Sequence, residues 1–189
     1  NNTHIGRDIL NIRELDPRQW RYLVDLSAEL KAQKIAGVDQ HWFGGKNVLA
    51  NFEWGSTRTR CAFETSCNDL GMGFTYLSNS HVNDTETLKD SIRVFVEMYD
   101  LIVWRAQRPE DYIYSIAEYS GVPVINALSL GDHPTQMLAD ALTMEEQWGG
   151  PGSCKGKRLA FVGNVSGAGL WYGRLAAMMD MDFYAIAPE

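Results

Sequence analysis

The stretch Asn47-Val48-Leu49-Ala50-Asn51-Phe52, followed after three residues by Ser56-Thr57-Arg58-Thr59-Arg60, decides the fold class. Its first part is an apolar run typical of a buried strand. Beyond it, apolar residues recur at near-helical spacing and two glycines supply a stop: Cys61, Ala62, Phe63, Cys67 and Leu70, then Gly71 and Gly73. The pattern predicts a strand that hands over to a helix, with Ser56 at the N-cap.

The start of this helix is a candidate anion site. A helix start leaves backbone N–H groups unpaired and carries a partial positive charge, which a phosphate can satisfy. Hydroxyls of Ser56, Thr57 and Thr59 add neutral donors, and Arg58 adds a forked, permanently charged one. Arg60 lies about 200° around the helix from Arg58, so we expect it in a structural ion pair. The alternative is an ordinary N-capped helix with two exposed arginines.

Apolar runs and helical patterns alternate along the first 148 residues. Expected strands cover 48–52, 73–77, 101–104 and 122–127, and expected helices cover 16–37, 56–70, 85–99, 111–119 and 134–148. Asp16 is the candidate cap of the first helix and Pro17 its candidate first residue. This alternation predicts a doubly wound α/β fold, a parallel sheet with helices on both faces and ligands at the carboxyl ends of its strands.

A glycine-rich segment divides the chain. Gly149-Gly150-Pro151-Gly152-Ser153 indicates a linker, which we place at residues 149–157 between a domain at 1–148 and a second module at 158–189. The second module contains an expected strand at 158–162, a turn at 163–169, a helix at 170–179 and a strand at 183–187. These elements cannot cover both faces of a sheet, so we expect the incomplete beginning of a second α/β domain.

Composition narrows the function classes. Of 189 residues, 45% are apolar and 22% charged, which is typical of a soluble globular protein. No apolar run approaches the roughly 18 residues of a membrane span, and no signal-peptide core is visible, so we expect no membrane partner and a cytoplasmic location. A net charge of −7 disfavours nucleic-acid binding. The three cysteines have neither disulfide nor zinc spacing, and no metal is expected.

Two further elements supply candidate ligand groups. His133 precedes Pro134, which suits a first helical turn, and Gln136 lies on that turn. A histidine in this place can also be a simple cap or a surface residue. Arg105 ends the strand at 101–104 and therefore belongs at the carboxyl edge of the sheet. We expect these three residues to meet the helix start at 56–59 around one small anion.

Together these residues resemble the carbamoyltransferases, and most closely their ornithine branch. The matching segments are Phe52-Glu53, Ser56-Thr57-Arg58-Thr59-Arg60, Cys61-Ala62-Phe63-Glu64, Leu88-Lys89-Asp90-Ser91, Met98-Tyr99-Asp100, Ala117-Glu118-Tyr119, Val122-Pro123-Val124 and His133-Pro134-Thr135-Gln136. The resemblance implies a carbamoyl-phosphate-binding domain, then an amino-acid-binding domain, in a homotrimer with active sites between subunits. It implies an enzyme of arginine metabolism that carbamoylates the side-chain amine of ornithine, giving citrulline and phosphate without a cofactor.

The resemblance also implies roles for individual residues. The carbamoyl-phosphate contacts fall on Ser56, Thr57, Arg58, Thr59, Arg105, His133 and Gln136. Arg58 and Arg105 are expected to hold the phosphate, and Thr59, His133 and Arg105 to donate to the carbonyl oxygen. Gln136 is expected to orient the carbamoyl amide. The catalytic residues in this scheme are Arg58, Arg105 and His133.

Two segments depart from the family pattern. Residues 78–85 lack the Gln or Lys that usually reaches a neighbouring subunit, and His81 is a substitute donor or an exposed loop residue. Residues 163–169 lack the usual Asp and Asn ligands of the amino acid and do not form a GxGxxG nucleotide motif. These departures leave two alternatives open: a sister carbamoyltransferase that uses another amine, and a non-catalytic protein that only binds the anion or assembles.

Overall fold

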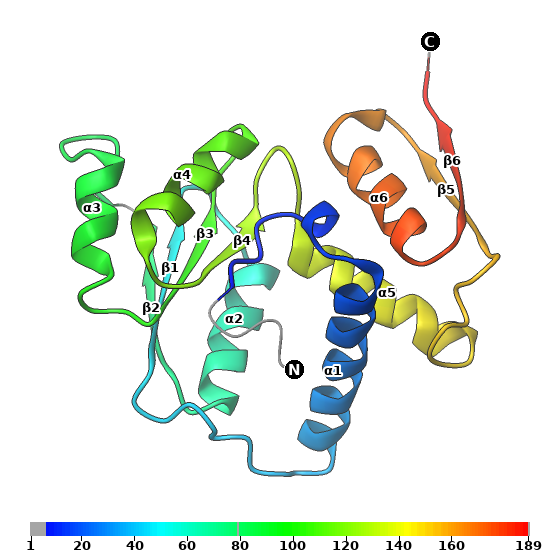
Figure 1. The fold of residues 1–189 in the computed structure, drawn as a ribbon, viewed down its shortest axis with the longest axis horizontal. Helices are drawn as coiled ribbons and strands as arrows, with labels where there is room; N and C mark the ends of the chain where they lie inside the picture. Colours follow the sequence, from blue (N-terminus) through cyan, green and yellow to red (C-terminus); the bar gives the residue numbers. More distant parts are fainter. Residues whose placement is uncertain (1–6, 79, 189) are drawn as a thin grey trace. The chain divides into compact units, whose positions relative to one another are not determined.

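The computed structural model describes residues 7–78 and 80–188, which form two compact units (Figure 1). The first unit comprises residues up to Leu10 together with Gly37–Leu130, and the second comprises Asn11–Ala36 and the residues from Gly131 onward. The units are therefore interleaved along the chain. The domain division expected around 149–157 stays a prediction. Among the described residues, no helix has both the length and the apolar character that crossing a membrane requires.

The first unit is a four-stranded parallel sheet with helices on both faces. Its strands are β1 (Asn47–Phe52), β2 (Gly73–Leu77), β3 (Leu101–Arg105) and β4 (Val124–Leu128), in the order β2-β1-β3-β4. Its helices are α2 (Arg58–Asp69), α3 (Leu88–Phe95) and α4 (Glu110–Ser120). The doubly wound α/β fold predicted from the alternation is confirmed.

Side-chain alternation along the strands explains the two layers. Val48 and Phe52 of β1 share one buried cluster with Cys67 of α2, so α2 covers that face. Ile102 of β3 lies in a second buried cluster, with Ile92 of α3 and residues of α4, on the opposite face. Because both faces are covered, the strands are apolar almost throughout, as is usual for parallel sheets.

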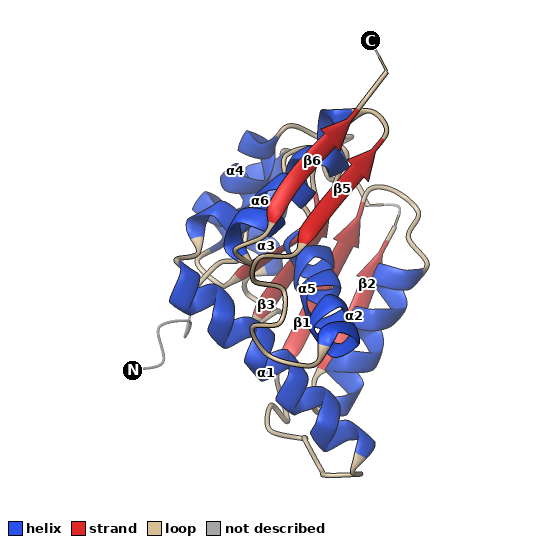
Figure 2. Ribbon diagram, turned by 90° about the vertical axis from the view of Figure 1, so that its right-hand side faces the viewer, coloured by secondary structure: helices blue, strands red, loops and turns tan. Residues whose placement is uncertain are grey.

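The second unit contains a helical layer and a parallel strand pair. Its elements are the short 3-10 helix η1 (Ile12–Glu14), α1 (Pro17–Ile35), α5 (Pro134–Trp148), β5 (Arg158–Val162), the irregular turn η2 (Val165–Gly169), α6 (Leu170–Met178) and β6 (Asp182–Ile186). β5 and β6 run side by side in the same direction (Figure 2). One buried cluster joins Trp20 of α1, Met137 of α5 and Leu175 of α6. The expected strand–helix–strand module after the linker is therefore present.

Helix caps explain where the elements begin. The Asp16 side chain accepts from the N–H groups of Arg18 and Gln19, and the Gln19 side chain in turn accepts from the Asp16 N–H at 2.9 Å. α1 therefore starts with the predicted cap and Pro17. The helix expected at 85–99 is shorter at both ends, since α3 spans Leu88–Phe95. Its start is set by the Thr87 side chain, which accepts from the Asp90 N–H.

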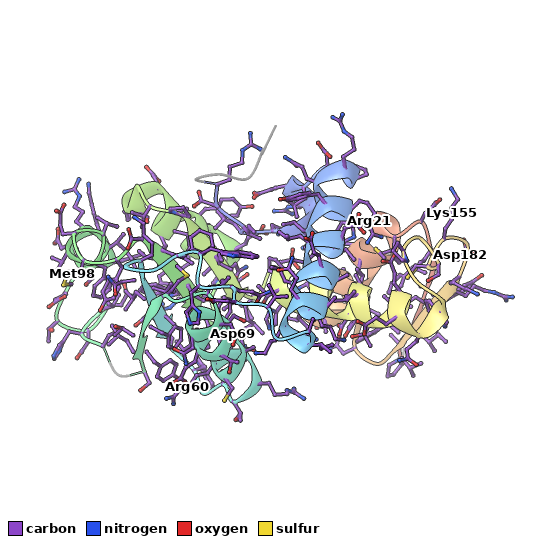
Figure 3. The ribbon with its side chains drawn as sticks, turned by 90° about the horizontal axis from the view of Figure 1, so that it is seen from below. Arg21, Arg60, Asp69, Met98, Lys155 and Asp182 are labelled. Carbon is purple, nitrogen blue, oxygen red and sulfur yellow. The ribbon has the colours of Figure 1, made fainter. Side chains whose placement is uncertain are left out.

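A buried carboxylate in the second unit generates the first prediction. The Glu145 side chain of α5 is 3% exposed, and its two carboxylate oxygens accept hydrogen bonds from the two terminal nitrogens of Arg21 on α1, at 2.6 and 2.9 Å (Figure 3 labels Arg21). It also accepts the Gly152 N–H at 2.7 Å. The adjacent Glu146 pairs with Lys31, but both side chains are largely exposed. Adjacent glutamates thus make a buried and a surface ion pair between the same two helices.

We expect Glu145→Ala to lower the free energy of unfolding by about 2 kcal/mol, because it removes the acceptor of the Gly152 N–H and leaves the partly buried Arg21 guanidinium with only Asp25, at 2.7 Å, as its partner. Glu146→Ala should lower it by less than about 1 kcal/mol, since exposed pairs are weak. Urea denaturation followed by circular dichroism measures both values. Equal losses in the two variants would contradict the assignment of Glu145 as a buried anchor.

Candidate anion-binding site

The turn from β1 into α2 presents an uncapped helix start. α2 begins at Arg58 with Thr57 at the N-cap, so the predicted N-cap at Ser56 is wrong by one residue. Thr57 already has helical backbone angles, φ −91° and ψ −62°, which keep its hydroxyl from capping the helix. Within residues 7–78 and 80–188, no side chain caps α2. Its first N–H groups therefore remain available to an anion.

The charges at this helix start favour an anion. The first turn of α2 carries no acidic residue, and the Arg58 side chain is exposed. The Arg60 side chain instead contacts Glu64 and Tyr76 (Figure 3 labels Arg60 on α2). Its Nε lies 3.7 Å from the Glu64 carboxylate, and its Cζ lies 4.1 Å from the centroid of the Tyr76 ring. The predicted structural ion pair of Arg60 is confirmed, and Arg58 is left for a ligand.

Arg105 lies at the carboxyl end of β3, next to the same turn. It pairs in register with Phe52, the last residue of β1, and its carbonyl oxygen accepts the Glu53 N–H at 2.9 Å. The pairing of β3 with β4 shifts between Trp104 and Arg105, opposite Leu128, whose φ of 148° is strained for a non-glycine residue. This irregularity lies at the last residue of β3, where Arg105 reaches the carboxyl edge of the sheet.

The Arg105 guanidinium is poorly satisfied. Its Nη1 donates to the Ala127 carbonyl over 3.4 Å, and its Nε is buried without a hydrogen-bond partner. No carboxylate forms an ion pair with it in the described part of the chain. Burial lowers the pKa of Arg105, only partly offset by the nearby Tyr76. A partly buried cation without an acid is the arrangement expected where an anionic ligand completes the site.

Glu53 is the functional candidate that the sequence reasoning missed. Its carboxylate accepts from Trp104 Nε1 at 3.2 Å, from Arg108 Nε at 2.8 Å and from the Tyr112 hydroxyl at 2.7 Å. Burial, followed by the hydrogen bond to Glu53, raises the pKa of Tyr112. The hydrogen bond between Arg108 and Glu53 raises the pKa of Arg108. Because three donors hold Glu53, this carboxylate does not neutralise Arg105. The signals in the sequence were its place directly after an apolar strand and the match of Phe52-Glu53 to the family.

The second unit holds the other two candidates on one turn. His133 occupies the N-cap of α5 and is 6% exposed, with Pro134 first in the helix as predicted. Its backbone N–H donates to Asp132 at 2.8 Å, and its ring meets the Trp171 ring edge-on at 6.2 Å. Gln136 is exposed, and its side-chain nitrogen donates to Asp140 at 2.9 Å.

The structure therefore groups the predicted site residues in two sets. Ser56, Thr57, Arg58, Thr59 and Arg105 lie at the carboxyl edge of the adjacent strands β1 and β3 in the first unit. His133 and Gln136 share the first turn of α5 in the second unit. That the two sets meet around one ligand stays a prediction.

Residues 7–146 match the family described as "Aspartate/ornithine carbamoyltransferase, carbamoyl-P binding domain". The chain belongs to this family. A catabolic ornithine carbamoyltransferase of Clostridium perfringens strain 13 is 43% identical over 188 residues, covering 97% of this chain and 55% of that protein. One from Treponema denticola is 41% identical and likewise covers 97% of this chain. The chain spans about half the length of the curated relatives it matches.

Solved carbamoyltransferase structures share the fold. A mitochondrial ornithine carbamoyltransferase from Coccidioides immitis matches with a TM-score of 0.90 at 29% identity, covering 97% of this chain and 60% of that one. An ornithine carbamoyltransferase from Burkholderia thailandensis matches with a TM-score of 0.88 at 30% identity, covering 96% and 62%. The family resemblance stated from the motifs is confirmed.

In both segments that depart from the family pattern, an asparagine side chain is already hydrogen-bonded within the protein. In the first, Asn83 has a φ of 61° and donates from its side chain to the Tyr112 hydroxyl at 2.6 Å. Residue 79 of that segment lies outside the described residues. In the second, the Asn164 side chain accepts from the backbone and the hydroxyl of Ser166, at 3.0 and 2.9 Å. Asn164 is thus used within its own turn.

The packing of α2 against the sheet makes a testable difference between two cysteines. Cys61 is exposed, whereas Cys67 is 4% exposed and burial raises the pKa of its thiol to about 11. Because the thiolate is the reactive form, we expect iodoacetamide at pH 8 to alkylate Cys61 at least about a hundredfold faster than Cys67. Peptide mass spectrometry measures both rates. In urea the two cysteines should react alike, and equal rates in native buffer would contradict the burial of this face of α2.

Proposed function

We propose that this chain is the carbamoyl-phosphate-binding part of an ornithine-type carbamoyltransferase. The reaction transfers the carbamoyl group of carbamoyl phosphate to the side-chain amine of ornithine and gives citrulline and phosphate. One observation carries the proposal: the partly buried Arg105 guanidinium, without a carboxylate partner, ends the strand beside the uncapped start of α2. The match of residues 7–146 to a carbamoyl-phosphate-binding domain supports it.

The phosphate of the substrate is bound in this proposal by the first unit. The N–H groups at the start of α2 and the hydroxyls of Ser56, Thr57 and Thr59 donate to its oxygens, and Arg58 and Arg105 neutralise its charge. Glu53 keeps Arg105 in place through the bond between its N–H and the Arg105 carbonyl oxygen, while its own carboxylate stays engaged elsewhere. Phosphate then supplies the acceptors that Arg105 lacks.

The chemistry requires only positioning and charge stabilisation. The amine attacks the carbamoyl carbon, and negative charge develops on the carbonyl oxygen and then on the departing phosphate. Thr59, Arg105 and His133 donate to the carbonyl oxygen in this scheme, and Gln136 orients the carbamoyl amide. Well-oriented reactants can recover roughly 7–11 kcal/mol of the barrier, so no covalent intermediate is needed. The three residues that carry charge or proton donation, Arg58, Arg105 and His133, are the proposed catalytic residues.

The proposal extends to the organisation of the whole protein. Residues 1–148 form the carbamoyl-phosphate-binding domain, 149–157 the linker and 158–189 the beginning of the amino-acid-binding domain. We propose a cytoplasmic homotrimer, as the family resemblance implies, with carbamoyl phosphate and an amine as its small-molecule partners. The names of the catabolic relatives from Clostridium perfringens and Treponema denticola support ornithine as that amine.

A second candidate function is a carbamoyltransferase that uses another amine. The observation that favours it is Asn164, whose side chain is bonded inside its own turn rather than presented to a ligand. Residues 163–169 also lack the acidic ligand that ornithine-type enzymes usually carry there.

Carbamoyl phosphate should raise the melting temperature of the chain, because it binds the folded protein and supplies acceptors to Arg58 and Arg105. Arg58→Ala removes one charged donor, which should cost about 3 kcal/mol of binding and abolish the rise. Differential scanning fluorimetry with and without the ligand measures the shift. Arg93→Ala, which removes an exposed arginine of α3, is the matched control and should keep the shift. A chain that shows no shift before any substitution would favour a role in assembly alone.

The acceptor is tested by product formation in a protein that includes the rest of the amino-acid-binding domain. With carbamoyl phosphate and a panel of amines, we expect carbamoylated product from ornithine, detected by mass spectrometry. His133→Ala should lower kcat by about a hundredfold, the usual effect of losing one oxyanion donor. Product from putrescine and none from ornithine would move the assignment to the second candidate.

A further inference from the structure

Gln136 is held by a hydrogen-bond chain that reaches it from α6. Its side-chain nitrogen donates to one carboxylate oxygen of Asp140, one turn further along α5, at 2.9 Å. The hydroxyl of Tyr172 on α6 donates to the other oxygen of Asp140 at 2.8 Å. All three side chains belong to the second unit. Asp140 therefore sits between Tyr172 and Gln136 with both oxygens engaged.

The chemistry of this chain fixes which end of the Gln136 amide faces outward. An ionised carboxylate only accepts hydrogen bonds, so Asp140 binds the NH₂ group of Gln136 and excludes its carbonyl oxygen. Burial, followed by the bond to Asp140, raises the pKa of Tyr172 to about 12, so its hydroxyl stays a donor at neutral pH. The exposed Gln136 thus presents its carbonyl oxygen, an acceptor, away from Asp140.

We infer that Asp140 and Tyr172 are positioning residues that make Gln136 select a ligand with an N–H donor. This inference rests on the proposed function, in which Gln136 meets the carbamoyl end of carbamoyl phosphate. Carbamoyl phosphate and acetyl phosphate differ there by an NH₂ group in place of a methyl group. A fixed acceptor binds the first and leaves itself unpaired against the second, which is how polar sites reject analogues that lack a donor.

The rest of α6 keeps this turn of α5 rigid. Trp171 packs edge-on against His133, and Arg174 donates to the Gly131 carbonyl at 2.7 Å. Leu175 and Ala176 of α6 lie in the same buried cluster as Met137 of α5. Residues along α6 therefore contact the segment before α5 and its N-cap, and pack in one cluster with its first turn. A support of this kind restricts the rotamers of a recognition residue better than a loop does.

The first test compares the dissociation constants of carbamoyl phosphate and acetyl phosphate by calorimetry on the 189-residue chain. We expect the unchanged chain to prefer carbamoyl phosphate by about tenfold or more, the value of one hydrogen bond. Asp140→Asn should reduce the preference to about twofold or less, because the new amide can donate as well as accept and lets Gln136 turn over. Tyr172→Phe should give an intermediate preference.

Two variants at the exposed face of β6 serve as matched controls. Asp182→Asn and Tyr184→Phe make the same chemical changes at exposed side chains of the second unit (Figure 3 labels Asp182). They should leave the preference unchanged. If Asp140→Asn weakened both ligands by the same factor, Asp140 would have only a structural role and the inference would be overturned.

A second measurement needs no ligand and separates this inference from the proposed function. The side-chain amide of Gln136 is assigned in a ¹⁵N-labelled sample as the signal lost in Gln136→Glu. Asp140→Asn and Tyr172→Phe should shift that signal, whereas Asp182→Asn should not. An unmoved signal would overturn the proposed hydrogen-bond chain. If the unchanged chain bound neither acyl phosphate, the proposed function and the selectivity would both fail, and the spectra would still decide whether Asp140 holds Gln136.

Discussion

The candidate site depends on one electrostatic constraint, a cation that the protein itself does not neutralise. Arg105 ends a buried strand, its Nε has no hydrogen-bond partner among the described residues, and burial lowers its pKa. The carboxylate that follows the adjacent strand, Glu53, is already bound by three donors. In a chain of net charge −7, this arrangement keeps a local positive potential at the sheet edge. In the proposed function, a bound dianion supplies the missing acceptors.

Much of this arrangement could be predicted from the sequence because its causes are local. The alternation of apolar runs and helical patterns fixed the parallel sheet, since each strand and its helix are contiguous in the chain. Pro134 marks the first residue of α5 because its ring suits a position whose N–H is unpaired anyway. The spacing of Arg58 and Arg60 predicted that the two point in different directions, and Arg60 pairs with Glu64. The last two inferences needed only residues within about one helical turn, and the first needed only the order of neighbouring segments in the chain.

Other features could not be predicted because they depend on contacts between distant residues. Glu53 meets Tyr112 across 59 positions, and Tyr172 meets Asp140 across 32. The move of the N-cap from Ser56 to Thr57 follows from the path of the loop after Phe52, which residue preferences do not determine, because Ser and Thr are both good caps. Whether the α2 and α5 turns meet at one ligand likewise requires a measurement.

The two halves of the candidate site differ in the kind of recognition they can provide. The start of α2 and the two arginines offer charge and many donors, which bind any phosphate strongly but distinguish poorly between its substituents. Gln136 carries no charge, so its contribution depends on which end of its amide faces the ligand. Because a side-chain amide can rotate by 180°, it distinguishes a donor from an acceptor only if a neighbouring group holds it in one orientation. Asp140, itself bonded to Tyr172, is that neighbour. In the proposed function, selectivity for the carbamoyl group therefore rests on the uncharged Gln136 amide, oriented by Asp140 of α5 and Tyr172 of α6, while affinity rests on the arginines of the sheet edge.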